Sequence, residues 1–171
     1  MRNIEIKARL ADPPAARECA ARLCDCGPAA EFDHIDTYFN CDAGRLKLRE
    51  ISGSGAHCEL IFYMRPNVQG PRTSNYEIYP VLQPELLKTL LTAAYGVMVV
   101  VRKKRTLFLY ENVRIHIDEV EGLGAFLEFE AVMSDGASDS DGNKQLEFLL
   151  RKFNIAASDL VEGSYSDMLR I

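Results

Sequence analysis

The sequence predicts an α+β protein whose main element is a large antiparallel sheet or barrel. The first observation is that apolar and polar residues alternate over several short segments, which is typical of strands with one buried face. The second is that these segments follow one another across short turns, with only three or four helical segments among them. The 171 residues, 47% of them apolar, suffice for one core, so we expect a single domain over residues 1–171.

Eight segments have strand character. Residues 3–10 (NIEIKARL) alternate strictly, with Asn3, Glu5, Lys7 and Arg9 on one face and aliphatic side chains on the other. Turn sequences at 42–44, 52–55 and 111–112 separate further alternating segments. The other expected strands are residues 33–40, 45–50, 58–65, 76–81, 97–110, 112–120 and 125–133.

Helix signals are fewer. Asp12 followed by two prolines predicts an N-cap and first turn for a helix over residues 13–25. Pro84 opens a second helix over 84–95, which Gly96 ends. We expect polar loops at 66–74 and 134–143, and two further helices at 143–153 and 158–170.

Long charged side chains occupy one face of six of these strands, while the opposite faces are apolar. If the charged faces point to solvent, the protein is an ordinary sheet with its core on the other side. If the sheet closes into a barrel, the charged faces line the lumen and helices cover the apolar outside. Because six strands share the pattern, we favour the barrel, whose lumen has room for a small ligand.

The predicted lumen is rich in cations. Its basic residues are Lys7, Arg9, Arg45, Lys47, Arg49, Arg65, Lys103, Arg105 and Arg114, and its acidic residues are Glu5, Glu59, Asp118, Glu128 and Glu130. So many cations require an anion, because removing each from water costs several kcal/mol. A polyphosphate fits, since arginine binds phosphate oxygens through two N–H groups and lysine adds a point charge.

The acidic residues predict a metal site beside the phosphates. Carboxylates in such a position usually hold Mg²⁺ or Mn²⁺, whose remaining ligands are waters and phosphate oxygens. Glu5, Glu128 and Glu130 are the first candidates for metal ligands, and Asp118 is the next.

The composition excludes several partners. A net charge of -5 argues against a protein that coats nucleic acid. The sequence has no apolar run of about 18 residues and no apolar signal segment at its start, so we expect a cytoplasmic protein without a membrane partner. The sequence leaves open whether two copies pair into a homodimer.

These segments resemble, in order and spacing, the CYTH superfamily, also called the triphosphate tunnel metalloenzymes. The resemblance covers essentially the whole chain. Its motifs are NIEIK at 3–7 (for ExExK), HIDTYF at 34–39, GRLKLRE at 44–50, ELIFYMRP at 59–66, RTSNY at 72–76, K-x-R at 103–105, RIHID at 114–118, EGLGAFLEFE at 121–130 and SYSD at 164–167. It is closest to the CyaB-like branch, which includes class IV adenylyl cyclases.

The resemblance implies an eight-stranded antiparallel closed barrel, with a charged lumen that binds a triphosphate and with helices packed outside. By this resemblance Glu5, Lys7, Tyr38 and Arg65 belong to the catalytic centre. Two positions depart from the pattern. Asn3 replaces the first glutamate of ExExK, and Arg65 stands where some triphosphatases have a lysine that activates the equivalent of Tyr38. Arginine stays protonated and is not a base, so we expect activated water as the nucleophile.

Three functions remain open at this point. The first is a metal-dependent hydrolase acting on inorganic tripolyphosphate, thiamine triphosphate or a nucleoside triphosphate, which the presence of both Glu128 and Glu130 favours by resemblance. The second is an adenylyl cyclase that converts ATP to cyclic AMP and pyrophosphate. The third is a polyphosphate- or nucleotide-binding module without turnover, because Asn3 brings no charge to the metal site.

Overall fold

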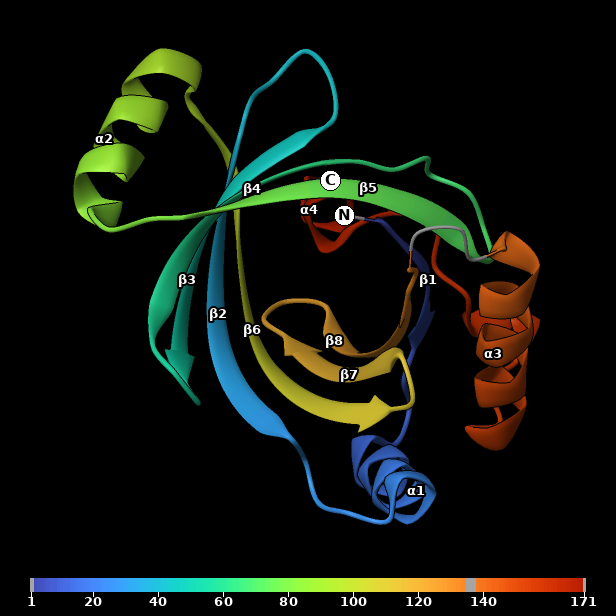
Figure 1. The fold of residues 1–171 in the computed structure, drawn as a ribbon. Coiled ribbons are helices and arrows are strands. Elements are labelled where there is room, and N and C mark those ends of the chain that lie inside the picture. Colours follow the sequence, from blue (N-terminus) through green and yellow to red (C-terminus); the bar gives the residue numbers. More distant parts are fainter. Residues whose placement is uncertain (1, 135–137, 171) are drawn as a thin grey trace.

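Eight antiparallel strands close into a barrel in the computed structural model, which describes residues 2–134 and 138–170. The strands are β1 (Arg2–Arg9), β2 (Ala30–Phe39), β3 (Arg45–Gly53), β4 (His57–Met64), β5 (Arg72–Pro80), β6 (Val97–Tyr110), β7 (Val113–Val120) and β8 (Gly124–Val132). Their order is β1-β5-β4-β3-β2-β6-β7-β8, and β8 pairs with β1 to complete the circle (Figure 1). The predicted closed barrel is therefore confirmed.

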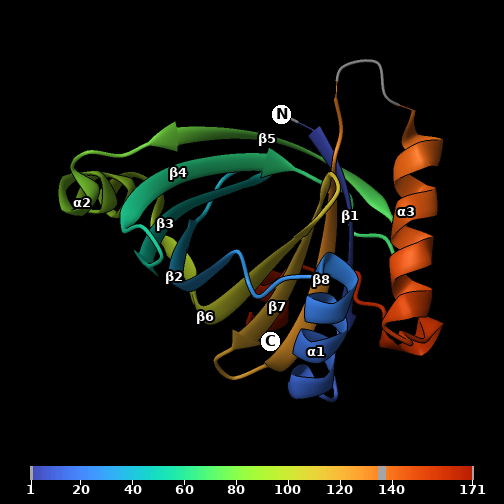
Figure 2. The ribbon, with the colours of Figure 1, turned by 60° about the horizontal axis from the view of Figure 1, so that its bottom comes forward.

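Helices lie outside the barrel. They are α1 (Pro13–Cys24), α2 (Pro84–Tyr95), α3 (Asp139–Lys152) and the one-turn α4 (Tyr165–Met168), with a 3-10 turn at Ala157–Asp159. The predicted cap of the first helix is present, since the Asp12 side chain accepts a hydrogen bond from the Ala15 N–H at 3.0 Å. In the side view α1 and α3 lie along one side of the barrel, and α2 stands at the far end (Figure 2).

Several predicted boundaries were wrong. The third helix begins at Asp139 rather than at residue 143, because Ser138 caps it and Asp139 and Asp141 place negative charge in its first turn. The predicted loop over 66–74 ends early, since β5 already begins at Arg72. The strand expected at 33–40 starts at Ala30. Residues 135–137 of the expected polar loop lie outside the described residues.

The last helix was also wrong in extent. Instead of one helix over 158–170, the chain forms the 3-10 turn and α4, where Ser164 and Asp167 cap each other's backbone N–H groups. Between them the chain runs against β1, with a hydrogen bond of 2.9 Å from the Val161 N–H to the Lys7 carbonyl oxygen. The Tyr165 ring packs on Phe126 with their centroids 4.9 Å apart. This C-terminal segment therefore covers one end of the barrel.

The charged faces point inward and the apolar faces outward. Glu5, Lys7, Lys103 and Asp118 are between 0% and 6% exposed, which excludes the arrangement in which these charges face solvent. The outer faces of β1, β7 and β8 form the main apolar core with α1 and α3. Gly142 allows this close packing, because a Cβ atom there would lie 2.9 Å from Ile4 Cδ1. Within the described ranges, no helix is both long and apolar enough to cross a bilayer.

Replacement of Leu146 by alanine tests this core. Leu146 is fully buried between α3 and the barrel, so the change should lower the free energy of unfolding by about 2–5 kcal/mol. Urea denaturation measures the loss. The control is Leu82→Ala at a residue that is 96% exposed, where a change of less than about 0.5 kcal/mol is expected. Equal effects of the two substitutions would contradict the assignment of this core.

Candidate functional site

The barrel encloses a cavity of about 360 Å³ that all eight strands and α4 help to line. Its basic side chains are Lys7, Lys47, Arg49, Arg65, Lys103, Arg105 and Arg114, and its acidic ones are Glu5, Asp36, Glu59, Glu128 and Glu130. Seven of the nine predicted lumen cations and four of the five predicted acids thus line one space. The pairing register explains this, because cross-strand partners such as Lys7 and Glu128 project from the same face.

Asp36 holds two of the cations. Its carboxylate lies 2.8 Å from Lys47 Nζ and accepts two hydrogen bonds of 2.7 Å from Arg49. Burial alone would raise the pKa of Asp36, but Arg49 and Lys47 keep it well below its usual range. Burial and the neighbouring Arg49 lower the pKa of Lys47 to about 8. Sequence reasoning missed Asp36 as a site residue, although it belongs to the DTYF motif.

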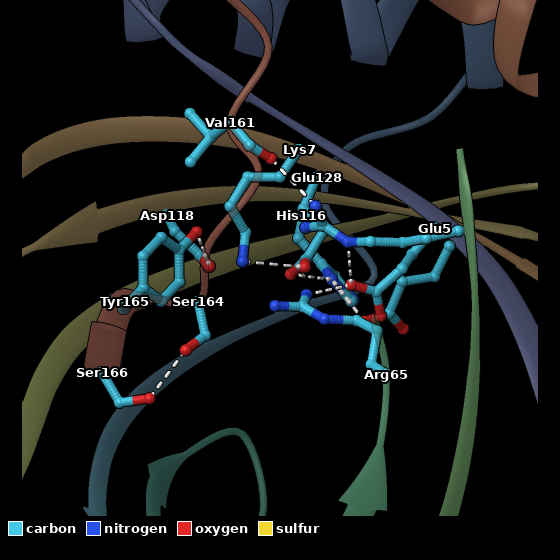
Figure 3. Close-up of polar contacts among 12 residues, drawn as sticks. Glu5, Lys7, Arg65, His116, Asp118, Glu128, Val161, Ser164, Tyr165 and Ser166 are labelled. Carbon is cyan, nitrogen blue, oxygen red and sulfur yellow. Dashed lines mark hydrogen bonds and ion pairs between the residues drawn. The ribbon is translucent and has the colours of Figure 1, made fainter. Parts of the chain in front are cut away.

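Asp118 holds the second pair of cations. It accepts hydrogen bonds from Arg105 at 2.6 and 2.7 Å and from Lys103 at 3.1 Å. It also accepts one from the Tyr165 hydroxyl at 2.8 Å, which Figure 3 shows. Burial and Arg105 lower the pKa of Lys103 to about 7. Asp118 is fully buried and does not itself line the cavity. Asp118, which the sequence analysis gave as a candidate metal ligand, is therefore surrounded by Lys103, Arg105 and the Tyr165 phenol.

Glu5 lines the cavity and forms ion pairs with two arginines. It forms an ion pair with Arg65, and its Oε1 lies 3.3 Å from Nε of Arg72 (Figure 3 shows the Glu5–Arg65 pair). Arg72 also donates to the carbonyl oxygens of Val161 and Glu162 at 2.9 and 2.7 Å, so it ties the C-terminal segment to β5. Arg72 was not predicted as a site residue, although the RTSNY motif begins with it.

His116, Glu128 and Glu130 form a compact group of donor atoms, and one such atom from each lies within 4.8 Å of the others. Nδ1 of His116 is 3.7 Å from a carboxylate oxygen of each glutamate and has no hydrogen-bond partner among the described residues. Glu128 also meets Lys7 at 3.1 Å and Arg105 at 2.8 Å, whereas Glu130 lies 3.8 Å from Arg114. This buried nitrogen between two carboxylates fits a divalent metal.

Tyr38 lies deep in the cavity. Its hydroxyl is 3.4 Å from that of Tyr63 and 3.5 Å from Lys47 Nζ. Burial and the neighbouring Tyr63 raise the pKa of Tyr38 well above its usual value, so the phenol is neutral. Arg65, the other residue expected in the catalytic centre, is engaged by Glu5.

Two predicted phosphate ligands lie outside the cavity. Arg9 is exposed at the end of β1, with its guanidinium 5.4 Å from the centroid of the Phe126 ring. Arg45 donates to Asp167 and Asn67, each at 2.8 Å, and thereby fastens the C-terminal segment to β3. The alternation of polar and apolar residues predicts which face of a strand a side chain lies on. It does not predict how far along the barrel axis that residue lies.

The chain is similar to known proteins over nearly its whole length. Adenylate cyclase CyaB of Aeromonas hydrophila is 23% identical over 171 residues, which cover 95% of this chain and 86% of that protein. The structure of the PH1012 protein from Pyrococcus horikoshii OT3 superimposes with a TM-score of 0.85 at 21% identity, covering 96% of this chain and 98% of that one. The PH1819 protein of the same organism gives a TM-score of 0.78 at 20% identity, covering 98% and 97%.

Residues 1–165 match the CYTH domain family. This match covers all eight strands and every residue that lines the cavity. The solved structures show the same fold, and the Aeromonas hydrophila relative aligns with 95% of this chain. The resemblance seen in the motifs is therefore confirmed, and this chain belongs to the CYTH family.

Proposed function

We propose that the chain, acting as one domain over residues 1–171, binds a small molecule bearing a triphosphate inside the barrel and hydrolyses it with Mg²⁺ or Mn²⁺. The observation that carries this proposal is the single cavity in which paired cations adjoin the group His116, Glu128 and Glu130. Cations and a metal beside one another are what phosphoryl transfer requires, because most of its catalysis is positioning and charge stabilisation.

The cations suit a phosphate chain. Lys47, Arg49, Lys103 and Arg105 approach from β3 and β6, which flank β2 on its two sides. Each is already oriented by Asp36 or Asp118, so little conformational entropy is lost when a ligand binds. An incoming phosphate oxygen can bind their remaining N–H groups, since lysine and arginine have three and five donors.

The metal would be held by Glu128, Glu130 and His116. When bound, a divalent ion polarises phosphate oxygens and offsets their negative charge. Asn3 Oδ1 is buried, lines the cavity and has no hydrogen-bond partner among the described residues, so it offers a neutral oxygen where the ExExK signature has a carboxylate. We infer a site of lower charge than one built from that signature, and its nitrogen ligand favours Mn²⁺ over Mg²⁺.

Few cavity residues are suited to accept the proton of an attacking water. Tyr38 is neutral and Arg65 stays protonated, so neither is a base. Of the two carboxylates in the proposed metal group, Glu130 is the more weakly paired, with Arg114 at 3.8 Å, whereas Glu128 contacts Lys7 at 3.1 Å and Arg105 at 2.8 Å. Of these two, Glu130 is therefore the better placed to orient water or to accept a proton.

Adenylyl cyclase activity is the second candidate. It is favoured by the relative named Adenylate cyclase CyaB, which aligns with 95% of this chain. The same cations would then orient ATP for attack of its 3′-oxygen on the α-phosphorus. Fold alone does not decide between the two reactions, because one fold supports different chemistries.

Product analysis distinguishes these reactions. The pure protein is incubated with Mn²⁺ or Mg²⁺ and with tripolyphosphate, thiamine triphosphate or ATP. Hydrolysis predicts orthophosphate and a diphosphate product, with higher turnover in Mn²⁺ than in Mg²⁺. Cyclic AMP with pyrophosphate from ATP would replace the proposal by the cyclase. Binding without turnover of any substrate would contradict both and would leave a binding module.

Replacement of Glu130 by glutamine tests the metal group. The substitution keeps the size of the side chain and leaves no tightly paired cation behind, so the fold should persist. We expect the affinity for Mn²⁺, measured by calorimetry, and the turnover to fall at least about 10-fold each. The matched control is Glu147→Gln at an exposed position on α3, which should change neither. Unchanged Mn²⁺ affinity in Glu130→Gln would refute the proposed ligand set.

Proton uptake tests whether the phosphates meet Lys47. Its pKa in the free protein is about 8, and a bound polyanion stabilises the charged form and raises that pKa. Affinity for tripolyphosphate should therefore be full below pH 8 and should weaken as pH rises above it. Calorimetry at about pH 9, in buffers that differ in ionisation enthalpy, should show proton uptake on binding. Lys47→Arg, which stays charged, should reduce the uptake; identical uptake would place Lys47 away from the ligand.

A further inference from the structure

Helix α2 differs from the other long helices in how little of it is buried. α1 buries Ala16 and Ala20 against the barrel, and α3 buries Leu146 and Leu149. None of the 12 residues of α2, all of which the structure describes, is buried. Figure 1 and Figure 2 both show α2 on the side of the barrel away from α3. A helix of this length is marginal in water without packing, so α2 lacks a partner that would stabilise it.

The inner side of α2 makes a thin contact with the barrel. Its main neighbours are β2 and β3. Leu87 and Leu91 are half-buried on this side, and Lys88 Nζ lies 2.6 Å from a carboxylate oxygen of Glu50 on β3. Residues three and four positions apart share one face of a helix. These three residues therefore define the inner side of α2 and leave the opposite side to solvent.

The outer side of α2 is apolar. Leu86 and Leu90, which lie one turn apart, are 54% and 57% exposed. The exposed Ala93 continues the same side of the helix. A stripe of this kind is the surface with which a helix normally packs against another element. The outer side thus has the character of a contact surface, although nothing within the described part of this chain covers it.

A hollow of about 400 Å³ lies beside the two leucines. It is lined by residues of α2 alone, which are Glu85, Lys88, Thr89, Thr92 and Ala93. Leu86 and Leu90 form a ridge of the i, i+4 type next to the short side chains of Thr89 and Ala93. Helices pack by placing such a ridge of one helix into a groove of another. α2 therefore carries a ridge and a groove that can receive it.

A surface with both a ridge and a matching groove is complementary to itself, which is what an interface around a twofold axis requires. We propose that α2 docks antiparallel on α2 of a second copy of this chain. The pair is centred on Thr89, so that Leu86 of each copy lies in the hollow of the other, opposite Thr92. We call this surface the α2 face, and it consists of Leu86, Thr89, Leu90, Thr92 and Ala93.

The charges of α2 favour a second copy over a lipid surface. α2 contains one acidic and one basic residue, Glu85 and Lys88, and Lys88 is paired with Glu50. Helices that lie on membranes carry many lysines and arginines that attract anionic lipids, whereas this chain has a net charge of -5. In the antiparallel pair the two Glu85 positions are about 12 Å apart along the axis, at 1.5 Å per residue. Salt screens their repulsion at that separation.

The ends of α2 add apolar surface to the same region. A standard interface buries about 800 Å² on each partner, which is more than the α2 face supplies alone. Tyr79 before the helix is 68% exposed, and Tyr95 and Val97 at its end are 52% and 42% exposed. Aromatic side chains contribute large areas to interfaces. With these neighbours the region approaches the size that a stable dimer needs.

Analytical ultracentrifugation of the full chain tests the dimer. We expect a species of twice the 19.2 kDa of one chain at about 10 µM, because interfaces of standard size have micromolar or tighter dissociation constants. Leu86→Arg should raise the dissociation constant at least about 10-fold, since it buries an unpaired charge in the hollow. Circular dichroism checks that this variant folds. The matched control is Leu109→Arg on β6, at a residue 52% exposed, which should leave the constant within about 2-fold.

Ala93→Trp tests the hollow itself. The tryptophan adds apolar surface, so nonspecific adhesion would become stronger, whereas a filled hollow excludes Leu86 and should weaken the dimer at least about 10-fold. A monomeric wild-type protein, an unchanged dimer in Leu86→Arg or a stronger dimer in Ala93→Trp would each overturn the proposal. Flotation of the wild-type protein with vesicles of phosphatidylcholine and phosphatidylglycerol, lost in Leu86→Arg, would overturn it by assigning the α2 face to a membrane.

Discussion

The structure depends on the mutual neutralisation of charges inside a closed barrel. Removing a carboxylate or an ammonium group from water costs several kcal/mol unless a partner of opposite charge is close by. Asp36, Asp118 and Glu128 each meet this requirement by contacting two cations. These three carboxylates allow charged faces to point inward, and inward charged faces in turn leave the apolar faces to pack against α1 and α3.

The same pairing prepares the barrel for an anion. Each cation is held in place by a carboxylate, yet burial still lowers the pKa values of Lys47 and Lys103 to about 8 and 7. The carboxylates therefore do not fully offset the cost of burying these lysines, and a bound anion would stabilise their charged forms. The C-terminal segment contributes by covering one end of the barrel, where Tyr165 donates to Asp118 and Arg72 binds the Val161 and Glu162 carbonyls.

The fold was largely predictable, because alternation within short segments reports which face of a strand is buried. The positions of the charged residues along the barrel were not. Arg9 shares a face with Glu5 and Lys7 but ends its strand outside the cavity, and Asp118 lies beneath Lys103 and Arg105. The position of a residue along the barrel axis depends on how neighbouring strands are staggered. That stagger follows from pairing between segments distant in sequence.

The central claim is that a triphosphate and its metal share the barrel interior. A crystal structure with Mn²⁺ and a non-hydrolysable analogue of ATP, using the anomalous signal of manganese, tests it most directly. The account predicts manganese bound by Glu128, Glu130 and His116, with the phosphates in contact with Lys47, Lys103 and Arg105. Manganese away from these three ligands, or phosphates on the outer surface of the barrel, would contradict it.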